Sequence, residues 1–405
     1  MADPWHSLIE RIHATPQQAV IVATGGGASA ISDLLAVPGG SRTLLEAVVP
    51  YSEAALAAWL RKKPEHFCVE ETALAMAAVA YERACTLAPA AEGAPLTHVG
   101  VACTASLVSD RPKKGDHRCH IATQTRTGTA AWSLALEKGA RGRSGEETLV
   151  GHLVLHALAS AVGLDNLPAL DLRSGEKIVT HHATADPLLV ELVAGKRCVV
   201  WSLPGVTSGH TAPGERSAVE PGSSLHATIP VPLSPPAGLL CGAFHPLHFG
   251  HRQMRAVAAR RLGGPIYYEM SIRNVDKPPL DFLSIDRRRA QFTDEPLALT
   301  AAPTFAEKAA VLPRVTFVVG VDTAERIVHP RYYGGSEEAM HGALTRIRDA
   351  GSRFLVAGRK IGERFETLAD IVLPPEFAPL FIAIPPEEFR ADISSTELRR
   401  AEPPP

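Results

Sequence analysis

Two histidines lie in a glycine-rich decapeptide, residues 242–251, which reads Gly-Ala-Phe-His-Pro-Leu-His-Phe-Gly-His. His248 and His251 are three residues apart, and imidazole N–H groups can donate hydrogen bonds to phosphate oxygens and stabilise charge that develops during a reaction. Gly242 and Gly250 lack a Cβ, which lets a backbone come close to a phosphate. These residue types at this spacing predict phosphate chemistry.

The neighbouring segments predict how the decapeptide is held. Residues 237–241 form a short apolar run of strand length, and residues 253–262 form a helical stretch free of glycine and proline. A turn that leads from a strand into a helix is a ready anion site, because free backbone N–H groups and the positive end of the helix dipole face the same space. The alternative is a strand–turn–helix corner that carries two surface histidines.

The decapeptide fits the pattern G-x-F-x-P-x-H-x-G-H and resembles the nucleotidyltransferase superfamily that carries HxGH. That superfamily includes nicotinamide mononucleotide, nicotinate mononucleotide and pantetheine-phosphate adenylyltransferases and several cytidylyltransferases. The resemblance implies a Rossmann-like, doubly wound parallel sheet with ATP above the strand ends. It implies catalytic roles for His248 and His251, and an ATP site that includes Gly242, Phe244 and Gly250.

A second motif follows near the C-terminus, where residues 393–399 read Ile-Ser-Ser-Thr-Glu-Leu-Arg. Serine and threonine favour helix N-caps, so their hydroxyls and the free N–H groups of the first turn could hold phosphates, with arginine adding a delocalised charge. The stretch resembles the ISSTxIR signature of the mononucleotide adenylyltransferases, with Leu398 in place of isoleucine. Taken alone it is a helix cap. The candidate phosphate-binding residues are Ser394, Ser395, Thr396 and Arg399.

Between the two motifs the chain alternates strands and helices as a parallel α/β domain does. We expect strands at 265–270, 315–320, 353–358 and 380–384, and a basic helix at 284–292. Ligands of open parallel sheets lie beyond the carboxyl ends of the strands, so Asp322, just after the second of these strands, is a candidate substrate-binding residue. Lys277 could reach a phosphate. A plain strand-end turn and a solvated loop lysine are the alternatives for these two residues.

Residues 1–164 predict a separate α/β domain. A strand at 19–23 enters Thr24-Gly25-Gly26, and the chain continues with further helical and apolar stretches. We expect helices at 29–35, 53–61, 70–87 and 146–162, and a strand at 98–105. The segments 24–26, 37–41, 48–52 and 70–77 resemble the CinA C-terminal domain family, whose active members hydrolyse the amide of nicotinamide mononucleotide. The resemblance also implies possible homo-oligomers.

The departures from that family decide what the domain can do. The family motif places a nucleophilic serine at Ser41, a tyrosine at Tyr51 and a lysine that accepts the serine proton at position 56, which here is Leu56. A serine hydroxyl is a poor nucleophile without an adjacent base. Residues 21–23 and 100–104 also differ from the family pattern. We therefore expect a degenerate pocket at Ser41 and Tyr51 that has lost its amidase activity.

Residues 165–236 match neither family, and we expect a connecting subdomain followed by a linker rich in Gly, Pro, Ser and Thr. The transferase domain then spans 237–405. We expect residues 117–120 to form a basic loop and no metal to be bound by protein side chains. A formal net charge of −2 at pH 7 argues against nucleic acid as a partner. Apolar runs too short for a membrane span and six scattered cysteines favour a cytoplasmic protein with reduced thiols.

The two motifs predict an adenylyltransferase that joins AMP from ATP to a pyridine mononucleotide and releases pyrophosphate, with Mg²⁺ bound to ATP. The motifs leave open whether the acceptor is nicotinamide or nicotinate mononucleotide. One alternative is a regulator that binds pyridine nucleotides without turnover. The other is a different HxGH enzyme, a pantetheine-phosphate adenylyltransferase or a cytidylyltransferase.

Overall fold

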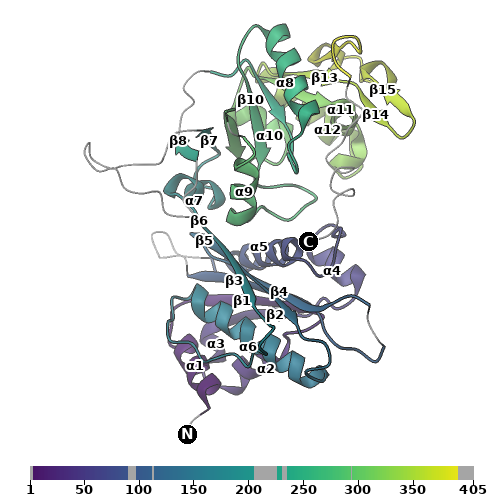
Figure 1. Cartoon of the computed structure of the whole chain (residues 1–405). Coiled ribbons are helices and arrows are strands. Elements are labelled where there is room, and N and C mark those ends of the chain that lie inside the picture. Colours follow the sequence, from purple (N-terminus) through teal and green to yellow (C-terminus); the bar gives the residue numbers. More distant parts are fainter. Residues whose placement is uncertain are drawn as a thin grey trace, which may run out of the picture. The chain divides into compact units, whose positions relative to one another are not determined.

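The structure of the chain is a computed structural model that describes residues 3–89, 97–111, 114–204, 226–229, 235–292 and 294–390. The chain divides into two compact units (Figure 1). The first comprises Met1–Asp186 with Asp276–Ile285, and the second comprises Pro187–Val275 with Asp286–Pro405. No helix in the described ranges is both long and apolar enough to span a bilayer.

The first unit is built on a mixed sheet with the strand order β2-β1-β3-β4-β5-β6. Strand β1, next to the edge strand β2, runs parallel to both of its neighbours, and the remaining pairs are antiparallel. The strands are β1 (Gln18–Thr24), β2 (Leu44–Val48), β3 (His98–Ser106), β4 (His117–Gln124), β5 (Gly128–Leu136) and β6 (Ile178–Thr184). Residues 117–120, expected to form a basic loop, are therefore the start of β4, where Cys119 is fully buried. Alternate apolar side chains in that strand outweigh its polar ones.

Helices cover both faces of this sheet (Figure 1). They are α1 (Pro4–His13), α2 (Ser29–Ala36), α3 (Gly40–Thr43), α4 (Glu53–Trp59), α5 (Glu70–Leu87) and α6 (Arg143–Ala161). The helices α1, α2 and α6 share one core with inward side chains of β1, β3, β4 and β5. On the other face α5 packs so closely on β3 that a Cβ at Gly100 would lie 2.2 Å from the carbonyl oxygen of Ala77. Glycine is needed at this contact because any side chain would collide with the helix backbone.

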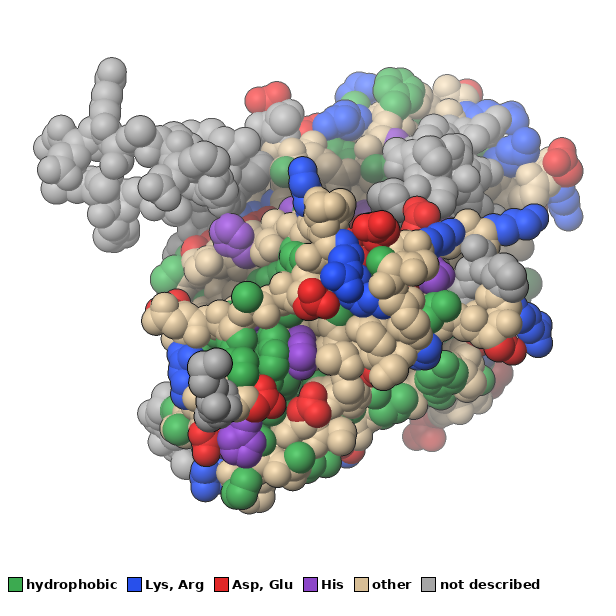
Figure 2. Space-filling view, turned by 60° about the horizontal axis from the view of Figure 1, so that its bottom comes forward, with side chains coloured by type: hydrophobic (Ala, Val, Ile, Leu, Met, Phe, Trp, Pro, Cys, Tyr) green, Lys and Arg blue, Asp and Glu red, His purple; other side chains and the backbone are tan. Residues whose placement is uncertain are grey.

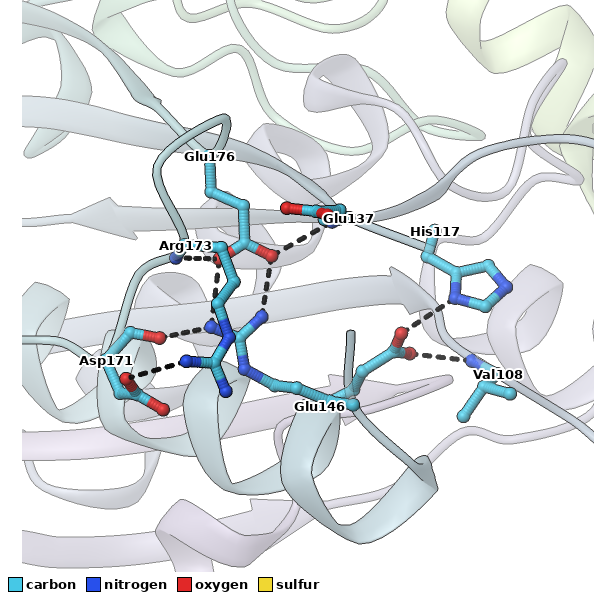
Figure 3. A network of polar contacts seen from close by, with 8 residues as sticks. Val108, His117, Glu137, Glu146, Asp171, Arg173 and Glu176 are labelled. Carbon is cyan, nitrogen blue, oxygen red and sulfur yellow. Dashed lines mark hydrogen bonds and ion pairs between the residues drawn. The ribbon is translucent and has the colours of Figure 1, made fainter. Parts of the chain in front are cut away.

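Residues 165–186 belong to the first unit rather than to a connecting subdomain. β6 pairs with β5 along its whole length, and this pairing satisfies backbone groups that β5 would otherwise leave open. Just before β6, the carboxylate of Glu176 accepts hydrogen bonds from the Arg141 guanidinium and from the backbone N–H groups of Glu137 and Arg173 (Figure 3). These bonds lower the pKa of Glu176 against the effect of its burial.

The second unit is built on a sheet with the order β16-β13-β12-β9-β10-β11-β7-β8. The six strands from β16 to β11 are parallel, and β7 and β8 add an antiparallel edge. The strands are β7 (Val199–Pro204), β8 (His226–Ile229), β9 (Gly238–Cys241), β10 (Ile266–Ser271), β11 (Leu297–Thr300), β12 (Thr316–Gly320), β13 (Arg353–Ala357) and β16 (Phe381–Ile384). Within the expected connecting region and linker, β7 and β8 are therefore strands of this sheet. Residues 205–225 and 230–234 lie outside the described residues.

The order of the parallel strands is that of a doubly wound fold. From β9 the chain adds β10 and β11 on one side and then returns to add β12, β13 and β16 on the other. The direction of winding reverses between β9 and β12, and ligands of such sheets bind in the crevice outside the carboxyl ends of the strands at this point. The expected α/β class and parallel sheet are confirmed.

The remaining elements of the second unit connect and flank these strands. They are α7 (Pro187–Val193), α8 (Phe249–Leu262), α9 (Phe282–Arg289, which spans the boundary at Ile285), α10 (Phe305–Val311), α11 (Val321–Ile327), α12 (Glu337–Asp349), the 3₁₀ turns Pro330–Tyr333, Leu368–Asp370 and Ala378–Leu380, and the hairpin β14 (Arg359–Ile361) and β15 (Arg364–Glu366). Figure 2 shows Lys and Arg side chains interspersed with Asp and Glu on one face, in keeping with the net charge of −2.

Candidate functional site

The glycine-rich turn follows β9 at the switch point of the second sheet. Phe244 adopts a φ of 46° and is 1% exposed. Its ring makes edge contacts with Tyr268 and Phe292, at centroid distances of 5.2 and 5.4 Å. A Cβ at Gly242 would lie 2.9 Å from this ring. Gly242 and Phe244, proposed from sequence as part of an ATP site, thus also have a packing role that anchors the turn.

The two histidines meet at the first turn of α8. The helix begins at Phe249, earlier than expected, so His248 is its N-cap and His251 is the third helical residue. Their rings stack at a centroid distance of 3.8 Å, and Gly250 between them is buried. The backbone N–H of His248 donates to Nδ1 of His251 at 3.3 Å. Nδ1 of His251 is therefore an acceptor, and in the neutral ring the proton lies on Nε2, where it is available to a ligand.

Burial and nearby positive charge keep both rings neutral. Burial lowers the pKa of His251 to about 3, with further contributions from His248, Arg359 and Arg252. Burial and then the charge of Arg359 lower the pKa of His248. Among the described residues, Nδ1 of His248 is buried without a hydrogen-bond partner. The site therefore presents neutral donors and one unsatisfied buried nitrogen at a helix N-terminus.

Asp322 and Arg359 complete this cluster. Asp322 lies in the first turn of α11, directly after β12, and Arg359 opens β14, directly after β13. Their side chains form an ion pair of 3.0 Å between Nη1 and Oδ2. Arg359 was missed in the sequence, although the rule that selected Asp322, a polar residue beyond the carboxyl end of a parallel strand, also selects it. Its effect on the pKa of both histidines places its charge near them.

The other residues expected at this site do not belong to the described part of the second unit. Lys277 falls in Asp276–Ile285, which belongs to the first compact unit and not to the unit of His248. That segment is held there by a hydrogen bond of 3.0 Å from the backbone N–H of Phe282 to Oγ1 of Thr129. The candidate phosphate-binding residues Ser394, Ser395, Thr396 and Arg399 lie outside the described residues. Within the described ranges no three His, Cys, Asp or Glu side chains are grouped as metal ligands require.

The first unit contains a cavity of about 520 Å³. Tyr51, which is 70% exposed, lies at this cavity, and Arg143 donates a hydrogen bond of 3.0 Å to the carbonyl oxygen of Gly25. The lining residues are Ala23, Gly25, Gly26, Ala28, Val49, Tyr51, Arg143, Ser144 and Glu147. Of the described residues, Ser41 is not part of the lining, and Leu56 is a core residue that is 2% exposed. The structure thus brings Tyr51 but not Ser41 to the cavity.

The first two turns of α6 supply Arg143, Ser144 and Glu147 to the cavity lining. Hydrogen bonds of Glu146 hold the start of this helix in place. The carboxylate of Glu146, which is fully buried, contacts Nδ1 of His117 at 2.7 Å and accepts a hydrogen bond of 2.7 Å from the backbone N–H of Val108 (Figure 3). A buried carboxylate with both oxygens engaged holds the helix at one position relative to β4. No motif in the sequence marks Arg143, Ser144 or Glu147 as cavity residues.

No protein-family model matches this chain, and no curated protein matches it. Several solved structures are similar. Among them are the competence/damage-inducible protein CihA from Agrobacterium tumefaciens (21% identity, 40% of this chain and 98% of that chain, TM-score 0.31), a competence-damaged protein (CinA) superfamily protein from Escherichia coli (18%, 38% and 85%, 0.29), and the competence damage-inducible protein A (ComA) from Klebsiella pneumoniae (18%, 40% and 96%, 0.30).

Proposed function

We propose that this protein transfers AMP from ATP to the 5′-phosphate of a pyridine mononucleotide, nicotinamide or nicotinate mononucleotide, and releases pyrophosphate. One observation carries the proposal: His248 and His251 stack as neutral donors at a helix N-terminus, at the switch point of a doubly wound sheet. This is the position at which such sheets bind nucleotides and at which helix N-termini bind phosphate.

The side chains around the histidines suit a triphosphate. In the proposed complex, Nε2–H of His251 donates to a phosphate oxygen, because its Nδ1 is engaged by the backbone of His248. Arg359 adds a cation, which Asp322 holds in place through the ion pair of 3.0 Å. Hydrogen bonds from such groups to charge that develops on oxygen lower the barrier of group transfer. By resemblance, Ser394–Thr396 and Arg399 would contact the same phosphates.

The reaction needs orientation more than it needs a protein base. An oxygen of the mononucleotide phosphate forms a bond to the α-phosphorus of ATP, and the bond from that phosphorus to the oxygen that bridges it to the β-phosphorus breaks. The attacking group is already an anion, so no proton must be removed, and pyrophosphate leaves with the electron pair. Mg²⁺ enters with ATP and neutralises triphosphate charge, while the protein supplies the N–H donors and the arginine.

The test is pyrophosphate release from ATP or CTP with nicotinamide mononucleotide, nicotinate mononucleotide or 4′-phosphopantetheine as the acceptor. We expect turnover with ATP and a pyridine mononucleotide. His251→Ala should lower kcat by roughly 100-fold, since it removes a donor to the transition state. The matched control is His341→Ala, which removes a half-buried histidine paired with Glu376. Absence of turnover with every acceptor, or full activity of His251→Ala, would reject the proposal; turnover only with 4′-phosphopantetheine or CTP would favour the other HxGH enzymes.

A second candidate function is the binding of a pyridine nucleotide by the first unit without turnover. The cavity beside Tyr51 and Arg143 combines an aromatic ring with a cation, which suits an aromatic nucleotide. Leu56 supplies no base for amide hydrolysis. We expect calorimetry of the full-length protein to show that nicotinamide mononucleotide binds at this cavity, and that Arg143→Gln weakens this binding. Ammonia release from nicotinamide mononucleotide above the level of Ser41→Ala would instead identify an active amidase.

A further inference from the structure

We propose that Gln291 is a positioning residue that holds the turn at 242–248 in its ligand-binding shape before any ligand arrives. The proposal rests on the proposed function for its effect on turnover, but its structural part can be tested by itself. Gln291 lies after α9, within the second unit, and is not part of either motif identified in the sequence.

The amide of Gln291 bridges two backbone groups of the turn. Its Oε1 accepts a hydrogen bond of 2.7 Å from the N–H of Leu247, and its Nε2 donates one of 2.9 Å to the carbonyl oxygen of Phe244. Leu247 offers a donor and Phe244 an acceptor, so the side chain opposite them must provide one acceptor and one donor. A carboxamide provides both, which sets its orientation without ambiguity.

The chain around Gln291 supports the same turn. Nη1 of Arg288 donates to the carbonyl oxygen of Ala243 at 3.3 Å, and the ring of Phe292 makes an edge contact with Phe244 at 5.4 Å. From the helix side, Nη2 of Arg252 donates to the backbone carbonyl oxygen of Gln291 at 3.3 Å. Arg288, Gln291 and Phe292 therefore all contact the turn, and the amide of Gln291 makes two hydrogen bonds to it.

The turn needs such support because its conformation is unfavourable by itself. Phe244 has a φ of 46°, in the left-handed region that side chains other than glycine rarely adopt. Leu247 directly precedes His248, so a shift of the turn moves the N-cap and the ring stacked on His251. A misplacement of about 1 Å in a reacting site can cost on the order of 100-fold in rate. The clamp thus acts on turnover through the histidines and does not contact the ligand.

The experiment compares Gln291→Met, which keeps the volume and removes both bonds, with Gln291→Glu, which keeps only the acceptor for Leu247. Amide hydrogen exchange at Leu247 reports on the clamp, and kcat and KM report on the reaction. We expect Gln291→Met to speed exchange at Leu247 at least tenfold and to lower kcat 10- to 100-fold with a smaller change in KM. Gln291→Glu should leave Leu247 closer to wild-type protection.

The matched control is Tyr333→Phe, which removes a side-chain hydrogen bond of 2.9 Å to the carbonyl oxygen of Ile327 elsewhere in the second unit. This variant should change neither the amide hydrogen exchange rate at Leu247 nor kcat.

An unchanged exchange rate at Leu247 in Gln291→Met would overturn the proposal. So would a faster exchange rate in that variant together with wild-type turnover. If wild type shows no turnover, the proposed function fails, while the exchange at Leu247 still decides whether Gln291 holds the turn.

Discussion

The stacked histidines make stability depend on pH. His251 has a pKa lowered to about 3 in the folded protein, whereas an unfolded chain binds a proton near pH 6.5. Below pH 6.5 the unfolded state therefore binds a proton that the folded state does not, and the free energy of unfolding falls as the pH falls. Between pH 7 and pH 5 this contribution amounts to at most about 2 kcal/mol.

We expect His251→Gln to reduce this pH dependence, because glutamine does not titrate. Urea unfolding of wild type and variant at pH 5, 6 and 7 measures it. Other partly buried histidines, such as His120, whose burial lowers its pKa to about 4, contribute equally to both proteins and cancel in the difference. Equal slopes for the two proteins would show that His251 titrates normally.

Arg359 links the acidic and the histidine parts of the site. Arg359→Gln should raise the pKa of both histidines, because their pKa values are lowered in part by its charge. If it also contacts ATP, kcat/KM for ATP should fall by roughly 10- to 100-fold, as expected for loss of a charge-assisted hydrogen bond of about 1.5–3 kcal/mol. Titration of the histidine ring protons by NMR measures the first effect, with Arg331→Gln as the control. Unshifted histidines would mean that Arg359 lies away from them in solution.

At the scale of elements, a buried ion pair joins α10 to the parallel sheet. Nζ of Lys308 lies 2.6 Å from Oε2 of Glu269, and both residues are buried. The second carboxylate oxygen accepts a hydrogen bond of 2.5 Å from Oγ1 of Thr300 on the next strand. The pair lies beside Cys241, the last residue of β9, and its charges act on that thiol, whose pKa burial raises.

We expect Lys308→Met to destabilise the second unit by about 3–5 kcal/mol, because it leaves the Glu269 carboxylate buried without a counter-charge. The double variant Glu269→Gln with Lys308→Met should cost less than Lys308→Met alone, since it removes the uncompensated charge. Urea unfolding followed by circular dichroism measures both. A double variant that is less stable than Lys308→Met would show that the pair itself, rather than relief of a lone charge, sets stability.

At the scale of the whole molecule, the first compact unit extends to Asp186 rather than to residue 164. A fragment of residues 1–164 lacks β6 and leaves the Arg141 side chain, which is 6% exposed, without Glu176. We expect it to melt well below the fragment 1–186 and to associate through the open edge of β5. Thermal unfolding compares the melting temperatures of the two fragments, and light scattering compares their association. The fragment 1–186 with Glu176→Gln keeps β6 but weakens the pairing with Arg141, and so separates the two contributions. Equal melting temperatures for 1–164 and 1–186 would contradict the role of β6.

Local patterns in the sequence determined much of the molecule. Helix α5 was expected at 70–87 and spans Glu70–Leu87, and the strands expected at 237–241, 353–358 and 380–384 agree with β9, β13 and β16 within one residue at each end. The three-residue spacing of His248 and His251 likewise predicted that the two side chains lie close together. Apolar periodicity and motif spacing predict these features because each depends on residues that are only a few positions apart.

Tertiary structure decided which distant segments meet. Arg359 pairs with Asp322, and Lys277 belongs to the first unit. Ser41 does not line the cavity, and Leu56 is a core residue. Residues of the expected connecting region form β6, β7 and β8. These outcomes depend on pairing between strands that are far apart in the sequence and on ion pairs that form only in the folded chain. Local periodicity in the sequence does not predict either of them.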